Sequence, residues 1–182
     1  MTKHTLARRR WFGRVSVPSI VGLGIAACVA GQGAATIAAQ SQGVCALLTI
    51  DEIHAVAPKM EIHDGVAAAN SAMELSTCRY TWGDGVKASA LVISINPASR
   101  VYVGMTPDAI KQRLASSVVP ETDDSAVPDV GDAAVFKAFS PYYVSASALL
   151  KGRVLQLNLE GDDAREMKGQ LLSLLKSAAS RM

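Results

Sequence analysis

The chain has 182 residues, a formal net charge of +2 and a mean hydropathy of +0.22. This length is sufficient for one domain of ordinary size plus an extension. Five of the 18 basic residues lie before position 15, whereas the first acidic residue is Asp51. The chain after residue 40 therefore carries 13 basic and 16 acidic residues, a net charge of −3, and contains no cluster of Lys and Arg. Because phosphate binding needs such clusters, nucleic acid is excluded as a partner.

Residues 1–39 are predicted to form an export signal and the start of a linker. Basic residues up to Arg14 are followed by an apolar run, Val15–Ala30, and then by small residues up to Ala39. This order is typical of a bacterial signal peptide. A retained transmembrane anchor is the alternative, but the run is rich in Ala and Gly and shorter than the roughly 20 apolar residues required. We therefore expect a domain that is periplasmic or membrane-anchored and faces away from the cytoplasm.

Two motifs within this segment leave its processing open. Arg9-Arg10-Trp11-Phe12 resembles the twin-arginine export motif, and the alternative is a simple basic segment of a Sec signal. Ile25-Ala26-Ala27-Cys28 resembles a bacterial lipobox, whose cysteine becomes lipidated. A lipid on Cys28 would hold the domain at a membrane surface, at about 0.8 kcal/mol for each buried methylene. The alternative is ordinary signal cleavage, after Ala35 or Ala39.

The chain contains three cysteines, Cys28, Cys45 and Cys78. An odd number in an exported protein needs an explanation, and lipidation or removal of Cys28 leaves two that can pair outside the cytoplasm. A Cys45–Cys78 disulfide would close a loop of roughly 34 residues and stabilise the fold by about 3–4 kcal/mol. A redox or metal-binding pair is the alternative, but there is no C-x-x-C and no histidine at ligand spacing.

Residues 40–182 are predicted to form a single domain. In its first half, Thr49 and Glu52 make a capping box that begins a helix over 50–57, which Pro58 ends. The pattern then predicts a brief strand over 59–63, a loop over 64–71, a strand over 74–82, the turn Gly83-Asp84-Gly85, a strand over 86–95 and a short extended piece over 101–103.

The second half begins with a helix that has Thr106 as N-cap and Pro107 at its first position. The pattern then predicts a long loop over 118–130, strands over 133–139, 142–150 and 153–160, and a last helix opened by a capping box of Asp163 and Glu166. Apolar residues at helical spacing define the buried face of that helix: Met167, Leu171, Leu174, Leu175 and Ala178. Since successive strands are joined by tight turns, we expect an α+β domain with a mostly antiparallel sheet flanked by helices.

Several of these motifs together resemble a family. Cys45-Ala46-Leu47-Leu48-Thr49 is similar to the C-[SA]-L-L-T start of small bacterial exported lipoproteins of unknown function, and Cys78-Arg79-Tyr80 and the stretch Val130–Ala134 fit the same pattern. These proteins resemble the PsbP-like α/β/α sandwich, here over residues 44–180. The resemblance implies a disulfide between the two matching cysteines and no catalytic residues. It implies no photosynthetic role, because a fold does not determine a function.

Catalytic and metal-binding patterns are not found in the sequence. His54 and His63 are nine residues apart, which fits neither a helical His pair nor a known Cys/His spacing. No G-x-S-x-G occurs, and Asp123-Asp124 and Asp162-Asp163 are interpreted as loop and cap residues. We therefore assign no catalytic residue, no metal ligand and no cofactor.

Four aromatic residues are the candidates for a binding surface. Tyr80 and Trp82 share one face of a predicted strand, and Tyr142 and Tyr143 straddle another. Core packing would account for one member of each set, and the others would contact a ligand or partner at a sheet face or loop rim. Trp82, beside the Gly83-Asp84-Gly85 turn, is the first of these to mutate.

These observations predict an exported, non-enzymatic binding or accessory domain of the bacterial cell envelope, with a protein or small ligand as its partner. One alternative is an envelope enzyme or enzyme inhibitor with an unrecognised site, for which His54, His63 and nearby acids would have to line a deep pocket. Another alternative is a carrier of a metal or small ligand.

Overall fold

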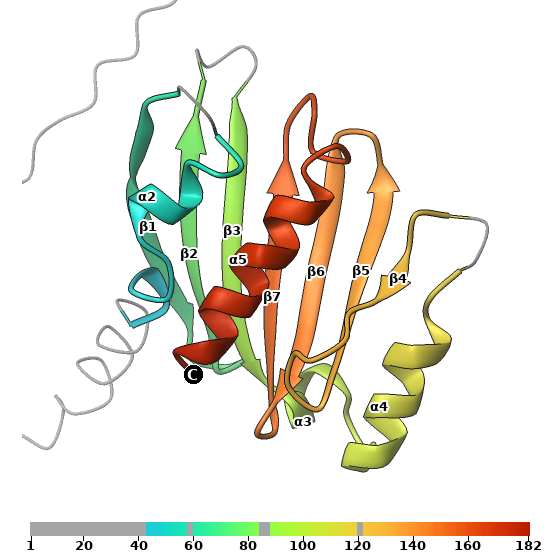
Figure 1. Cartoon of the computed structure of the whole chain (residues 1–182). Helices are drawn as coiled ribbons and strands as arrows, with labels where there is room; N and C mark the ends of the chain where they lie inside the picture. The colour runs from blue at the N-terminus through green and yellow to red at the C-terminus, as the bar shows by residue number, and fades with distance from the viewer. Residues whose placement is uncertain (1–42, 58–59, 84–87, 120–121) are drawn as a thin grey trace, which may run out of the picture.

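The computed structural model describes residues 43–57, 60–83, 88–119 and 122–182 (Figure 1). Cys28, the export motifs, the expected cleavage sites and Asp84-Gly85 lie outside these ranges. The elements are, in order, α2 (Ile50–Ile53), β1 (Ile62–Asn70), β2 (Leu75–Trp82), β3 (Ser89–Pro97), α3 (Ala98–Val101), α4 (Pro107–Ser116), β4 (Ser125–Ala126), β5 (Ala133–Ser140), β6 (Tyr143–Leu150), β7 (Arg153–Glu160) and α5 (Lys168–Ser180). Within these ranges, no helix combines the length and apolar character required to cross a membrane.

All the described strands belong to one seven-stranded sheet, in the order β1-β2-β3-β7-β6-β5-β4. Every neighbouring pair is antiparallel, including β3 and β7, which are far apart in the sequence. The predicted α+β class with an antiparallel sheet is therefore confirmed.

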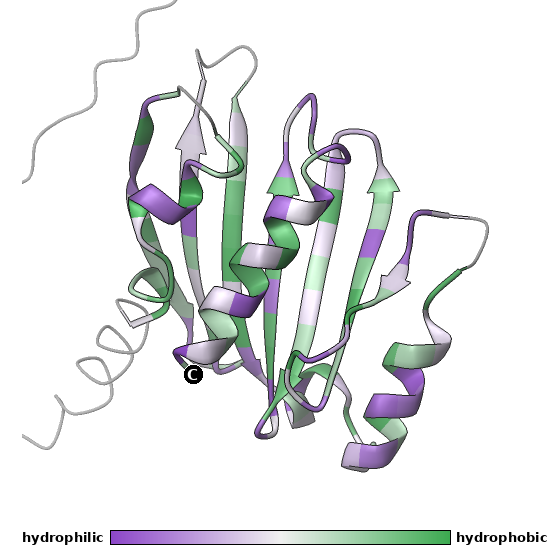
Figure 2. Cartoon of the chain, in the orientation of Figure 1, coloured by the Kyte–Doolittle hydropathy of each residue, from purple (hydrophilic) through white to green (hydrophobic). Residues whose placement is uncertain are grey.

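One face of the sheet is covered by α5 and by the segment 43–57 (Figure 1). Leu155, Leu157 and Leu159 alternate along β7 and are buried there, as the period-two pattern predicts (Figure 2). The expected leucines of α5 are buried against them, namely Leu171, Leu174 and Leu175. Each such side chain contributes about 1.5–3 kcal/mol by leaving water, so this interface forms the main core.

A smaller apolar cluster lies on the opposite face, at the end of the sheet near α3 and α4. Val135 and Leu149 are buried there against Ile110 and Leu114 of α4, whose burial the sequence predicts. The predicted Thr106 N-cap is confirmed, since its hydroxyl accepts a hydrogen bond from the backbone N–H of Ala109 at 3.3 Å. Helices thus contact both faces of the sheet, but α4 covers only one corner of its face.

The strand β1 corrects the prediction of a loop over 64–71. This stretch is rich in Gly and Ala, which have low strand propensity, and most of its side chains are exposed. It is nevertheless extended, because β2 offers it a partner ladder as far as Asn70, with a bulge between His63 and Val66. The edge strand therefore exists by tertiary pairing rather than by local preference.

Two further local predictions are wrong. No extended piece forms over 101–103: Val101 ends the one-turn helix α3, Tyr102 N donates to Ala98 O at 2.8 Å, and Val103 lies in a turn. The expected capping box of Asp163 and Glu166 does not form: α5 begins five residues later, at Lys168, and its N-cap position makes no side-chain hydrogen bond. Instead Glu166 N donates to the backbone oxygen of Asp163 at 3.0 Å, in a turn.

The remaining local predictions differ only in extent. The capping box of Thr49 and Glu52 is confirmed, although α2 ends at Ile53 and continues as turns to Ala57. The loop over 118–130 includes the two-residue strand β4, which pairs with β5.

Candidate functional site

The disulfide joins Cys45, in the N-terminal segment, to Cys78 in the middle of β2. Their Cα atoms are 5.1 Å apart, and the two residues are separated by 33 positions in the sequence. The predicted pairing is therefore present in the structure. It attaches the segment 43–57 to the face of the sheet that α5 also covers.

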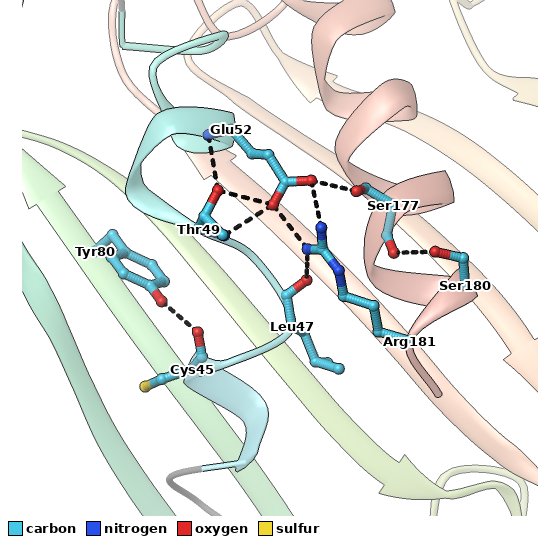
Figure 3. A network of polar contacts seen from close by, with 8 residues as sticks. All are labelled: Cys45, Leu47, Thr49, Glu52, Tyr80, Ser177, Ser180 and Arg181. Atoms are coloured by element: carbon cyan, nitrogen blue, oxygen red, sulfur yellow. Dashed lines mark hydrogen bonds and ion pairs between the residues drawn. The ribbon is translucent and has the colours of Figure 1, made fainter.

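A polar network attaches the same segment to α5 (Figure 3). The Arg181 guanidinium donates to both carboxylate oxygens of Glu52, at 2.7 and 2.9 Å, and to the backbone oxygen of Leu47 at 2.6 Å. Glu52 also accepts hydrogen bonds from the Ser177 hydroxyl and from the backbone N–H of Thr49. Both ends of the described domain are therefore joined by charged hydrogen bonds.

The Arg181 guanidinium lowers the pKa of Glu52 from 4.5 to about 2, assisted by hydrogen bonds from Ser177 and Thr49 and opposed by partial burial. The Glu52 and Arg181 side chains are 27% and 39% exposed, so water partly screens the pair. Glu52 is consequently ionised at neutral pH and already saturated with donors. We interpret it as a structural clamp rather than as an acid–base catalyst, which would need a pKa near the working pH.

Tyr80 and Trp82 lie in the core, with only 3% and 5% of their surface exposed. The Tyr80 hydroxyl donates to the backbone oxygen of Cys45 at 2.7 Å, so its polar tip is used inside the fold. The sequence predicted a core role for only one of these two. Both are buried because the segment 43–57 covers the face of β2 on which they lie.

Exposed aromatic side chains remain at the hairpin between β5 and β6. Tyr142 is 61% exposed, and Tyr143 is half-buried. The Tyr143 ring centroid lies 5.3 Å from that of Phe139, which is also 61% exposed. Phe139 is not among the aromatic candidates taken from the sequence, although the alternation along β5 places it on the same face as Tyr143.

The histidines do not form a site. His54 follows α2, with its Nδ1 3.4 Å from Ala57 O, and His63 is exposed on β1. In the described part of the chain, no group of three or more His, Cys, Asp or Glu side chains is arranged to hold a metal ion. Neither histidine lines either of the two cavities described below. Neither cavity is therefore the pocket of histidines and acids that the enzyme alternative requires.

The most distinctive hollow is a cavity of about 340 Å³ between the N-terminal segment, the β6–β7 turn and the end of α5. We call it the cationic cavity, because three positively charged side chains line it beside an apolar wall. Its lining comprises Gly43, Val44, Leu47, Ile95, Leu150, Lys151, Arg153, Ala179, Arg181 and Met182. Leu47 and Arg181 belong also to the polar network, so that network forms one side of the cavity (Figure 3).

A second cavity, of about 310 Å³, lies at the opposite end of the sheet. Trp82, Leu159 and Met167 form part of its apolar wall, and Glu160, Asp162 and Asp163 make its lining acidic. Because Trp82 is buried, it could contact a ligand only inside this cavity and not on an open surface of the domain.

Away from the corner that α4 covers, the sheet face opposite α5 is polar, and its polar side chains form hydrogen bonds with one another. The side-chain amide of Gln156 donates to Ser145 Oγ at 3.0 Å and to Asn158 Oδ1 at 3.1 Å. Arg79 of β2 and Glu160 of β7 form an ion pair at 3.3 Å across β3. Among the described residues, no buried side-chain nitrogen or oxygen lacks a hydrogen-bond partner. No buried polar side chain on this face is therefore left without a hydrogen-bond partner within the described chain.

Unlike this sheet face, the cationic cavity has charged side chains with no partner among the described residues. Within the described ranges, Lys151 and Arg153 make no side-chain hydrogen bond or ion pair, although both are at the cavity. No protein-family model, curated protein or solved structure matches this chain. The choice of the cationic cavity as the candidate binding site thus depends on its own geometry and charge.

Proposed function

We propose that this protein is an exported, non-enzymatic binding module of the bacterial cell envelope, and that the cationic cavity is its ligand site. The observation that carries the proposal is an open cavity that combines buried apolar residues with two cations lacking a partner in the described chain. Its volume lies at the lower end of the roughly 300–1,000 Å³ typical of small-molecule sites.

The disulfide supports the exported location. Stable disulfides are typical of proteins outside the cytoplasm and rare within it. The Cys45–Cys78 bond ties down a segment that contributes Val44 and Leu47 to the core. Together with the basic, apolar and small residues of positions 1–39, it favours export, with Cys28 as the site of a lipid anchor.

The PsbP-like architecture is part of the same proposal. In its favour are an antiparallel sheet with helices against both faces and a disulfide between the C-A-L-L-T and C-R-Y motifs. This likeness concerns the fold alone and names no ligand.

The location is tested by the intact mass of the protein purified from the envelope of its own bacterium. We expect a mass that lacks the signal, includes a lipid on Cys28 and shows the loss of two hydrogen atoms at the disulfide. Recovery of the unprocessed chain from the cytoplasm would contradict the exported location.

The binding role is tested by native mass spectrometry of the same preparation. We expect a ligand adduct on the unmodified protein and its loss in Ala179→Trp, because Ala179 lines the cavity and is partly buried. Ser173→Trp on the exposed side of α5 is the matched control. An adduct that both variants retain would exclude this cavity as the site.

A further inference from the structure

We infer that the cationic cavity takes a single-chain amphiphile with an anionic headgroup, its hydrocarbon chain against the apolar wall and its headgroup between Lys151 and Arg153. This inference rests on the proposed function, because it names the class of ligand for the same cavity. The shared chemistry is one aliphatic chain and one carboxylate or phosphate.

The apolar wall is contributed by four parts of the fold. Val44 and Leu47 come from the N-terminal segment, Ile95 from β3 and Leu150 from β6, and all four are buried. Ala179 extends the wall along α5. Because these elements are held together by the disulfide and the Glu52–Arg181 clamp, the wall is formed before any ligand arrives. An aliphatic chain placed against it would leave water without rearranging the fold.

The positive charge comes from the two-residue turn between β6 and β7. Lys151 and Gly152 have φ values of 48° and 76°, as the tight turn of a hairpin requires. This turn presents Lys151 and Arg153 as exposed side chains beside the cavity. A guanidinium can bind both oxygens of a carboxylate or phosphate, and an ammonium adds a second charged donor.

Arg181 does not add to this uncompensated charge. Its guanidinium already contacts both oxygens of Glu52, so the pair is close to neutral. Lys151 and Arg153 therefore account for the preference for an anion. The second cavity has a different lining, because its described charged residues are acidic and one of them, Glu160, is paired with Arg79.

The volume of the cationic cavity favours a ligand with one hydrocarbon chain. About 340 Å³ is near the lower limit for a small-molecule site, so a two-chain phospholipid would leave most of its hydrocarbon outside. A free inorganic anion would use the cations but leave the apolar wall in contact with water. The single-chain amphiphile is the class that uses both parts of the cavity.

Calorimetry on the full chain tests the inference, with dodecanoate, dodecyl phosphate, dodecyltrimethylammonium and inorganic phosphate below any micellar concentration. We expect at least one of the two anionic amphiphiles to bind roughly tenfold more tightly than the cationic one, and inorganic phosphate to bind much more weakly. Binding of dodecanoate alone would identify a carboxylate headgroup, and binding of dodecyl phosphate alone a phosphate headgroup. Either result supports the inference.

The decisive variant is the double substitution Lys151→Asn and Arg153→Gln, since Asn tolerates the left-handed turn position. We expect it to weaken anionic binding about tenfold and to leave the cationic probe unaffected. The matched control, Lys111→Gln with Arg113→Gln on α4, removes the same charge away from the cavity and should change neither. Lys151, Arg153 and Arg113 are exposed, and half-buried Lys111 loses only its pair with Asp108 at 3.6 Å, so the melting temperature should change little.

The outcomes separate this inference from the proposed function. If anionic and cationic amphiphiles bind equally and Ala179→Trp blocks both, the cavity is a ligand site but the headgroup assignment is overturned. If no amphiphile binds while the envelope-purified protein carries another adduct in the cavity, only the ligand class is overturned. If nothing binds in either experiment, both proposals are wrong. Equal weakening by the α4 control would also overturn the assignment to Lys151 and Arg153.

Discussion

Arg181 contacts both carboxylate oxygens of Glu52 across 129 positions of the sequence. The contact joins α2 to the residue that caps the end of α5. The same N-terminal segment is bonded covalently to β2 through Cys45. The wall of the cationic cavity formed by Val44 and Leu47 is thus attached to both the sheet and the last helix.

Substitution Glu52→Gln should lower the free energy of unfolding by about 1–2 kcal/mol, allowing for the partial solvent screening of the pair. The neutral amide leaves Arg181 without its charged partner. Urea denaturation of Glu52→Gln, Arg181→Gln and the double variant would measure the coupling between the two side chains. Strictly additive effects of the two substitutions would contradict a direct clamp.

The clamp should also make stability depend on acid pH. Because the pKa of Glu52 is about 2 in the folded state and 4.5 in the reference state, its stabilisation is complete above about pH 4.5 and declines as the pH falls toward 2. Arg165 lowers the pKa of Asp123 as well, so the unmodified protein should lose stability from both groups.

Denaturation measured from pH 6 to roughly pH 2 should therefore show a shallower loss for Glu52→Gln than for the unmodified protein. Parallel curves for the two proteins would show that Glu52 titrates alike in the folded and unfolded states.

Removal of the disulfide should cost about 3–4 kcal/mol by the chain-entropy estimate for a loop of this length. The test is urea denaturation of Cys45→Ser with Cys78→Ser, beside the unmodified protein with and without reductant. Reductant should destabilise the unmodified protein and leave the double variant unchanged. An equal effect of reductant on both would show that the disulfide is not its target.

The sequence predicts the centre of the fold better than its margins. Strands β2 and β7 carry a period-two pattern and helix α5 a helical one, because one face of each is buried against the core. Strand β1 has no such pattern: Gly65 and Ala67 are half-buried, Ala68 and Ala69 are exposed, and only the ladder to β2 makes this stretch extended. Its prediction as a loop failed because strand pairing is a property of two segments.

The candidate site was harder to predict for the same reason. The sequence indicates a turn at Lys151-Gly152 and the start of a strand at Arg153, but no local sequence pattern indicates that α5 ends beside them. The Thr49–Glu52 capping box was predicted, whereas the contact of Glu52 with Arg181 depends on how the first and last elements pack. The buried state of Trp82 likewise follows from the covering segment and not from β2 itself.

Two glycine substitutions should change stability in opposite directions. At Gly65 an added Cβ would lie 2.6 Å from Cys78 Sγ and 2.7 Å from the ring of Tyr80. Neither of these side chains can move away freely, because the sulfur is bonded to Cys45 and the Tyr80 hydroxyl donates to Cys45 O. Gly65→Ala must therefore displace packed atoms, and we expect it to destabilise the fold by about 1–3 kcal/mol.

At Gly169 an added Cβ meets no atom within 4 Å, and the residue lies inside α5. Gly169→Ala should stabilise the protein by about 0.5–1 kcal/mol, because alanine loses less backbone entropy in a helix. Thermal and urea denaturation of both variants would test the pair. If Gly65→Ala were neutral, β1 would have to lie farther from Cys78 and Tyr80 than the structure places it, and the close approach of the edge strand to the disulfide would be wrong.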